Sequence, residues 1–213
     1  MKSAGPLLAW PGWKHLVFST WVTLLGVIWF CLIYGGADAF TAHRHTRVRI
    51  HFDAELDIPF VPEAVVVYMS VYLLFLAAPF IVRHQREFLA LALTLDILIF
   101  VSGIGFLLVP AQLAFAPPSN LGAFPELFRF ADRLNLTYNL VPSLHVALSA
   151  CCVSVFVRHA SRIGRMFLLL WAAAIALSTL LMHQHHVLDV VTGLLLALAA
   201  FRWVFDPLHK HAR

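Results

Sequence analysis

Six apolar stretches constrain the fold of this 213-residue chain more than any other feature. They fall at about 16–36, 63–82, 88–109, 141–157, 166–182 and 187–205. About 20 apolar residues of helix cross the hydrocarbon core of a bilayer, and roughly 17 is near the lower limit. Only helices or closed barrels satisfy backbone groups in lipid, and these stretches are continuous rather than alternating. The pattern predicts an all-α integral membrane protein, a six-transmembrane-helix bundle with a single domain over residues 1–213.

Composition supports this class and excludes others. Hydrophobic residues make up 61% of the chain and charged residues only 12%, against about 25% charged in a soluble domain. The basic residues are scattered through short loops instead of being gathered on one face, which argues against nucleic-acid binding. The three cysteines lie in apolar runs without the spacing of metal ligands, so we interpret them as small core hydrophobes.

The basic residues also predict an orientation. With six spans, both termini share one side with the 83–87 and 158–165 loops, and that side carries ten Lys and Arg. The other side carries the remaining five of the 15 Lys and Arg residues in the chain. The positive-inside rule then places both termini in the cytoplasm, with the long connections at about 37–62 and 110–140 outside. The predicted location is a cell or plasma membrane, crossed several times.

The topology brings three chemically active residues together. His145 lies at the start of the fourth predicted span, and His185 with Asp189 lies at the start of the sixth. Two crossings separate them, so both groups are expected at the same depth near the outer surface. Ionisable residues at this depth are costly and are functional candidates by default. A nucleophilic histidine, an orienting acid and a second histidine as proton donor are the minimum set for phosphoryl transfer through a phosphohistidine.

Local spacing adds detail to this hypothesis. Pro142 suits the first turn of a helix, so the free amides of Ser143, Leu144 and His145 are expected to form a phosphate cradle. Asp189 follows His185 by four residues and can hold the proton of one imidazole nitrogen, leaving the other as a nucleophile. The alternative for this pair is a helix–helix tether.

Three other polar residues lie near or within the predicted spans. His183 and His186 are either substrate contacts or solvated interfacial residues. Asp96, in the middle of the third span, is expected to hydrogen bond to a neighbouring helix.

These residues resemble a known family. Pro142-Ser143-Leu144-His145 is similar to the Pro-Ser-Gly-His box of the type 2 phosphatidic acid phosphatase superfamily. The segment from Ser178 to Asp189 is similar to the family's Ser-Arg-x5-His-x3-Asp box. Ser178 and Thr179 take the first two positions, His185 follows after five residues, and Asp189 follows after three more. Leu144 and the stretch from Met182 to Gly193 look closest to the inositol phosphorylceramide synthase-like branch. The resemblance is specific over about 138–193 and implies a metal-independent enzyme without a cofactor.

The chain departs from the family at two positions. The Lys-x6-Arg-Pro box is missing, and Thr179 stands where the third box has arginine. Such cations hold the phosphate oxygens and stabilise the transition state. Arg129 and Arg133, in the second outer connection, are the predicted replacements.

The resulting hypothesis is a membrane lipid phosphatase that acts on a lipid phosphate or diphosphate at the extracytoplasmic face. His185 is the predicted nucleophile, Asp189 its orienting acid and His145 the proton donor. A phosphotransferase that uses a hydroxyl acceptor is the first alternative, because the same residues serve both reactions. A non-catalytic lipid binder or transporter is the second. The expected partners are the bilayer and a lipid phosphate, with no metal.

Overall fold

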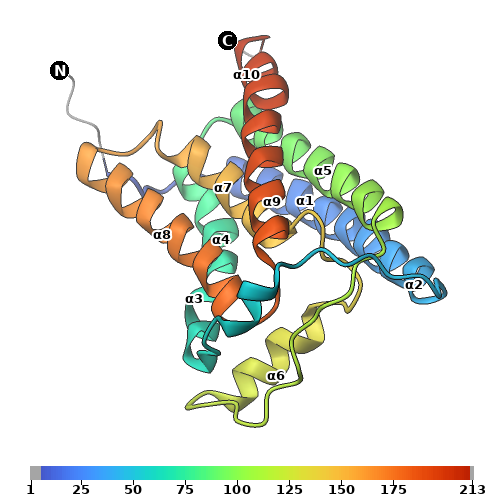
Figure 1. The fold of residues 1–213 in the computed structure, drawn as a ribbon. Coiled ribbons are helices and arrows are strands. Elements are labelled where there is room, and N and C mark those ends of the chain that lie inside the picture. The colour runs from blue at the N-terminus through green and yellow to red at the C-terminus, as the bar shows by residue number, and fades with distance from the viewer. Residues whose placement is uncertain (1–5, 212–213) are drawn as a thin grey trace.

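The computed structural model describes residues 6–211, and helices form nearly all of its regular structure. The chain begins with α1 (Trp13–Phe30), which continues through a π-helical segment (Cys31–Gly35) into α2 (Gly36–Ala42). After a 3-10 turn at Asp53–Asp57 come α3 (Val65–Met69), α4 (Val71–Ile81) and α5 (Gln85–Leu108). The amphipathic α6 (Pro125–Leu134) follows and lies at one end of the molecule (Figure 1).

The second half of the chain carries the residues singled out by the sequence. It contains α7 (Leu144–Phe156), α8 (Arg162–Leu181) and α9 (Val187–Ala200). A π-helical segment (Phe201–Phe205) then extends α9 into α10 (Asp206–His211). Within the described residues the only β contact is an isolated bridge between Val48 and Ala111.

Among residues 6–211, five helical segments are long and apolar enough to cross a membrane. They are Trp13–Ala42, Pro62–Ile81, Gln85–Leu108, Arg162–Leu181 and Val187–Lys210. Each overlaps one of the predicted spans. The all-helical, multi-pass class is therefore confirmed, although the predicted count of six is not.

The predicted fourth span is the exception. Its helix, α7, has 13 residues, which cover about 20 Å at 1.5 Å per residue. The apolar run 141–157 is longer than the helix itself because the helix begins only after Ser143. Most side chains of α7 are buried, and it packs against α4, α5, α8 and α9 (Figure 1). A helix enclosed by protein does not need to match the hydrocarbon thickness, since its neighbours satisfy the adjoining backbone.

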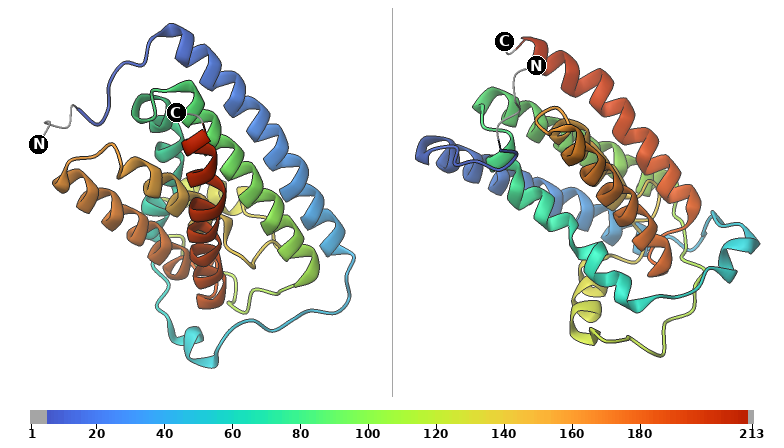
Figure 2. Two further views of the ribbon diagram at one scale, coloured as in Figure 1. Left: turned by 90° about the horizontal axis from the view of Figure 1, so that it is seen from above. Right: turned by 90° about the vertical axis from the view of Figure 1, so that its left-hand side faces the viewer.

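α7 nevertheless connects the two ends of the molecule. At its start, the backbone N–H of Ser143 donates to the carbonyl of Asp189. Just beyond its end, Arg158 pairs with Asp206 and His159 with Glu87. The N-terminal arm reaches the same end, because the N–H of Ala9 donates to the carbonyl of Phe80. The loops predicted to share the cytoplasmic side thus lie together (Figure 2).

Close packing of α9 on the start of α7 depends on Gly193. A Cβ atom at this position would lie 2.5 Å from the carbonyl oxygen of Ser143. The contact is with backbone, which cannot move aside as the end of a flexible side chain can. The absence of a side chain therefore sets the distance between α7, which carries His145, and α9, which carries Asp189 and begins just after His185.

We predict that Gly193→Ala lowers stability by about 1–3 kcal/mol, because the added methyl group separates α9 from α7. The measurement is the thermal unfolding temperature of the purified protein in detergent. Gly36→Ala is the matched control, since a Cβ there meets nothing within 4 Å. Equal unfolding temperatures for the two variants would contradict this account of the helix contact.

Candidate active site

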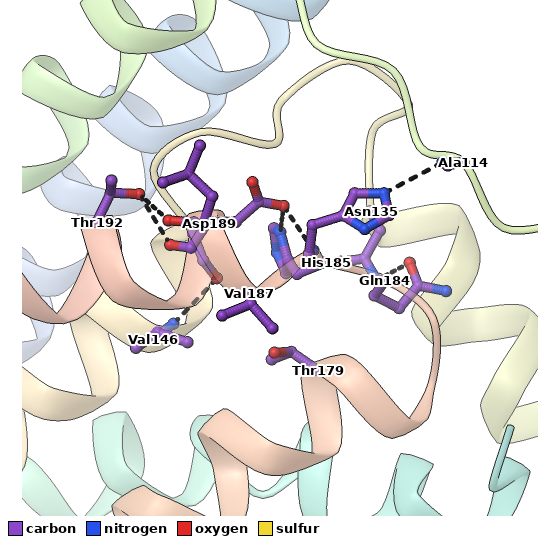
Figure 3. Close-up of polar contacts among 12 residues, drawn as sticks. Ala114, Asn135, Val146, Thr179, Gln184, His185, Val187, Asp189 and Thr192 are labelled. Atoms are coloured by element: carbon purple, nitrogen blue, oxygen red, sulfur yellow. Dashed lines mark hydrogen bonds and ion pairs between the residues drawn. The ribbon is translucent and has the colours of Figure 1, made fainter. Parts of the chain in front are cut away.

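His185 and Asp189 form the predicted pair. His185 lies in the turn just before α9, not on the helix as expected, and Asp189 is in its first turn. The Asp189 carboxylate reaches back, with Oδ2 3.2 Å from Nδ1 of His185 (Figure 3). Oδ2 also accepts the backbone N–H of His186 at 2.9 Å, which caps the helix. Because the carboxylate accepts from Nδ1, Nε2 of His185 is left with the lone pair.

His145 lies in the first turn of α7 and is held by Tyr68 of α3. Its Nε2 is 3.0 Å from the carbonyl oxygen of Tyr68, and the two rings stack with centroids 3.8 Å apart. A carbonyl oxygen only accepts, so Nε2 carries the proton and Nδ1 remains to exchange one. His145 is therefore fixed in ring orientation and in tautomer.

Both histidines line one cavity of about 900 Å³. Its walls come mainly from α1, α3, α4, α5 and α7, and most of the lining side chains are apolar. The convergence of His145 and His185 was predicted from the topology, and the structure brings them to the same cavity. A mostly apolar cavity with two histidines at one end suits an amphiphilic ligand.

The predicted phosphate cradle is only partly as expected. Pro142 precedes the helix, and Ser143 is the N-cap of α7, its hydroxyl accepting the N–H of Val146 at 3.4 Å. The N–H of Ser143 donates to the carbonyl of Asp189 at 3.0 Å, so the expectation that this amide is free was wrong. Leu144 lines the cavity beside His145. The contact of Ser143 instead ties the start of α7 to α9.

Arg129 and Arg133, the predicted replacement cations, lie on α6. Both are exposed, and neither lines the cavity, whereas Phe130 and Leu134 of the same helix do. Arg129 forms an ion pair with Glu126 on the surface. Helical periodicity explains the difference, since the apolar face of α6 turns toward the cavity and its charged face turns outward.

Sequence reasoning missed Glu55, which anchors the N-terminus of α9. Its Oε2 accepts hydrogen bonds from Nδ1 of His186 and the N–H of Val187, each at 3.0 Å. Nε2 of His186 in turn accepts the N–H of Ala114 at 3.1 Å. The fully buried His186 thus joins both long connections to the helix that carries Asp189. It is neither a substrate contact nor a solvated residue, and a lone glutamate in a loop carries no sequence signal for this role.

A second missed network supports His145. The hydroxyl of Tyr68 donates to Oδ1 of Asn135 at 2.7 Å, and Nδ2 of Asn135 donates to Oε1 of Gln184 at 3.0 Å. Tyr68 holds His145 and Gln184 precedes His185, so this chain of hydrogen bonds joins the support of His145 to the segment that carries His185. Within residues 6–211, no group of three His, Cys, Asp or Glu side chains is placed to hold a metal ion.

Comparison with known proteins finds one matching family model. The model of the PAP2 superfamily matches residues 112–212, a stretch that includes His145, His185 and Asp189. Members of this superfamily are generally phosphatases or phosphotransferases, which supports an enzymatic activity. No curated protein and no solved structure matches the chain. The finer resemblance to the inositol phosphorylceramide synthase-like branch stays a prediction.

Burial of His186 predicts a pH dependence of stability. The pKa of His186 is lower than its ordinary value of 6.5, mainly because the side chain is buried. The nearby carboxylates of Asp189 and Glu55 raise this pKa, but burial has the larger effect. As the pH falls through 6.5, the unfolded chain takes up a proton that the folded protein resists, so stability decreases. We expect His186→Gln to flatten this decrease in unfolding temperature. His45→Gln, at an exposed position, should keep the wild-type slope. If the unfolding temperature of His186→Gln decreased with pH in parallel with wild type, His186 would not be the source of the pH dependence.

Proposed function

We propose that this protein is a membrane lipid phosphatase that removes phosphate from a lipid phosphate or diphosphate through a phosphohistidine. The observation that carries the proposal is the pair of histidines in one cavity, with their tautomers fixed by Asp189 and the carbonyl of Tyr68. The match to the PAP2 superfamily supports it. The apolar remainder of the cavity suits the hydrocarbon part of such a substrate.

In the first step, Nε2 of His185 attacks phosphorus, and the bond from phosphorus to the lipid oxygen breaks. Asp189 stabilises the positive charge that develops on the His185 ring. His145, protonated on both nitrogens, gives its Nδ1 proton to the leaving oxygen. The products are a lipid alcohol, or a lipid monophosphate from a diphosphate, and a phosphorylated His185.

In the second step, water attacks the phosphohistidine and its proton passes to Nδ1 of His145. The phosphorus–nitrogen bond breaks, phosphate leaves, and both histidines return to their starting states. Backbone N–H groups at the first turn of α7, from Leu144 and His145, are the proposed donors to the phosphate oxygens. If a lipid or inositol hydroxyl replaced water, the same residues would act as a phosphotransferase.

We also propose that the site faces the extracytoplasmic side. The support is the distribution of Lys and Arg, ten on the side of the termini and five on the other, together with the gathering of the 83–87 loop, Arg158 and α10 at the end opposite the histidines.

The direct test is phosphate release from short-chain phosphatidic acid or isoprenyl diphosphate in detergent. We expect His185→Ala to lower the rate at least about a thousandfold, because the nucleophile is lost. His183→Asn is the matched control: His183 bonds to the carbonyl of Ile58 outside the cavity, and asparagine tolerates its positive φ of 54°. This control should retain activity.

The other outcomes identify the alternatives. Transfer of a headgroup to an added hydroxyl acceptor, without phosphate release, would show a phosphotransferase. Lipid binding that persists in His185→Ala, with neither activity, would show a lipid binder. Strong inhibition by EDTA would contradict the metal-free scheme.

A further inference from the structure

The cavity extends well beyond the two histidines. On α5 its lining residues run from Phe88 to Ile99, and on the first helical segment from Val22 to Tyr34. The eleven helical steps from Phe88 to Ile99 span about 16 Å. The cavity therefore follows the helices into the depth of the membrane, away from the end that holds His145 and His185. A hydrocarbon chain attached to a phosphate at the histidines would lie along this wall.

One acidic residue, Asp96, interrupts the otherwise mostly apolar wall. The expected link between Asp96 and a neighbouring helix is made by its backbone, whose carbonyl accepts Nε1–H of Trp29 at 3.0 Å. In the part of the chain that the structure describes, no hydrogen bond or ion pair reaches the carboxyl group itself. Gly26 faces it from α1, where an added Cβ would lie 3.4 Å from Oδ1. The small residue leaves the carboxyl group accessible from the cavity.

The depth of Asp96 follows from the antiparallel packing of α5 and α7. Gly105 of α5 lies against Val141 and Pro142, so His145, three residues after Pro142, is nearly level with Ser102, three residues before Gly105. Asp96 is six residues deeper on α5, roughly 9 Å at 1.5 Å per residue. The carboxyl group thus lies below the headgroup position, beside the first part of the hydrocarbon region of a bound lipid.

We propose that Asp96 binds the carbonyl oxygen of the ester or amide linkage that joins a lipid's headgroup region to its hydrocarbon chains. This inference rests on the proposed function and narrows its substrate class to acyl lipid phosphates. A carboxyl group surrounded by hydrocarbon is costly unless it has a polar partner. As an uncharged acid it donates one hydrogen bond, which a carbonyl oxygen accepts. An isoprenyl chain has no oxygen at this depth and would leave the group unpaired.

The test compares substrates that differ only at the linkage. Phosphate release is measured for short-chain diacyl phosphatidic acid, for its dialkyl ether analogue and for a short-chain ceramide phosphate. We expect wild type to prefer the diacyl over the dialkyl substrate by roughly threefold to tenfold in kcat/KM, the value of one hydrogen bond. A preference for the ceramide phosphate over the diacyl substrate would identify the amide carbonyl as the group that Asp96 binds. The reverse preference would identify the ester carbonyl.

Substitutions then assign the preference to Asp96. Asp96→Leu should bring the diacyl-to-dialkyl ratio close to one while activity on the dialkyl substrate remains, and Asp96→Asn should keep most of the preference because the amide also donates. Thr94→Val is the matched control, since Thr94 lies on the same helix, outside the cavity, with its hydroxyl bonded to the carbonyl of Ala90. It should keep the wild-type ratio.

Two results would overturn the inference. An active wild type that makes no distinction between the diacyl and dialkyl substrates, or an unchanged ratio in Asp96→Leu, removes the role of Asp96 and leaves the phosphatase intact. If Asp96→Leu does not fold, Asp96→Ala, which also removes the hydrogen-bond donor, takes its place, and an unchanged ratio in that variant overturns the inference equally. Absence of release from every probe by wild type rejects the proposed function, and the inference with it.

Discussion

The contacts of Asp189 organise the candidate active site. Its carboxylate holds Nδ1 of His185 and caps the N-terminus of α9 through His186, while its backbone carbonyl accepts the N–H of Ser143 at the start of α7. A buried carboxylate is costly unless donors share its charge, and the two donors to Oδ2, from His185 and His186, are parts of the site that must be aligned. One residue therefore fixes the tautomer of the proposed nucleophile and the position of the helix that carries His145.

The long connections complete this arrangement. Glu55 lies in the first long connection and accepts hydrogen bonds from His186 and Val187. Ala114 lies in the second long connection and donates a hydrogen bond to His186. Segments that lie far apart in the sequence thereby close around the N-terminus of α9. Tyr68 performs the corresponding task for His145, with Asn135 and Gln184 behind it. The two histidines are rigid because each is held by a neighbour that is itself hydrogen bonded.

The resemblance to the family could be read from spacing because its central interactions are local. His185 and Asp189 are four residues apart, and the carboxylate of Asp189, in the first turn of α9, reaches back to His185 just before the helix. The predicted roles of Arg129, Arg133 and the Ser143 amide depended on distant contacts. The structure turns the arginines outward on α6 and engages the amide with Asp189, since amphipathic packing and backbone pairing decide such details.

The sequence by itself determined the membrane class, five of the helical spans and the convergence of His145 with His185, because hydrophobic length and topology require them. Only the tertiary structure decided that α7 is short and enclosed, that Glu55 anchors the buried His186, and that Asp96 faces the same cavity as the histidines. Apolar composition does not distinguish a helix surrounded by lipid from one surrounded by protein. Partners of a buried polar group are set by packing between segments, which no local pattern records.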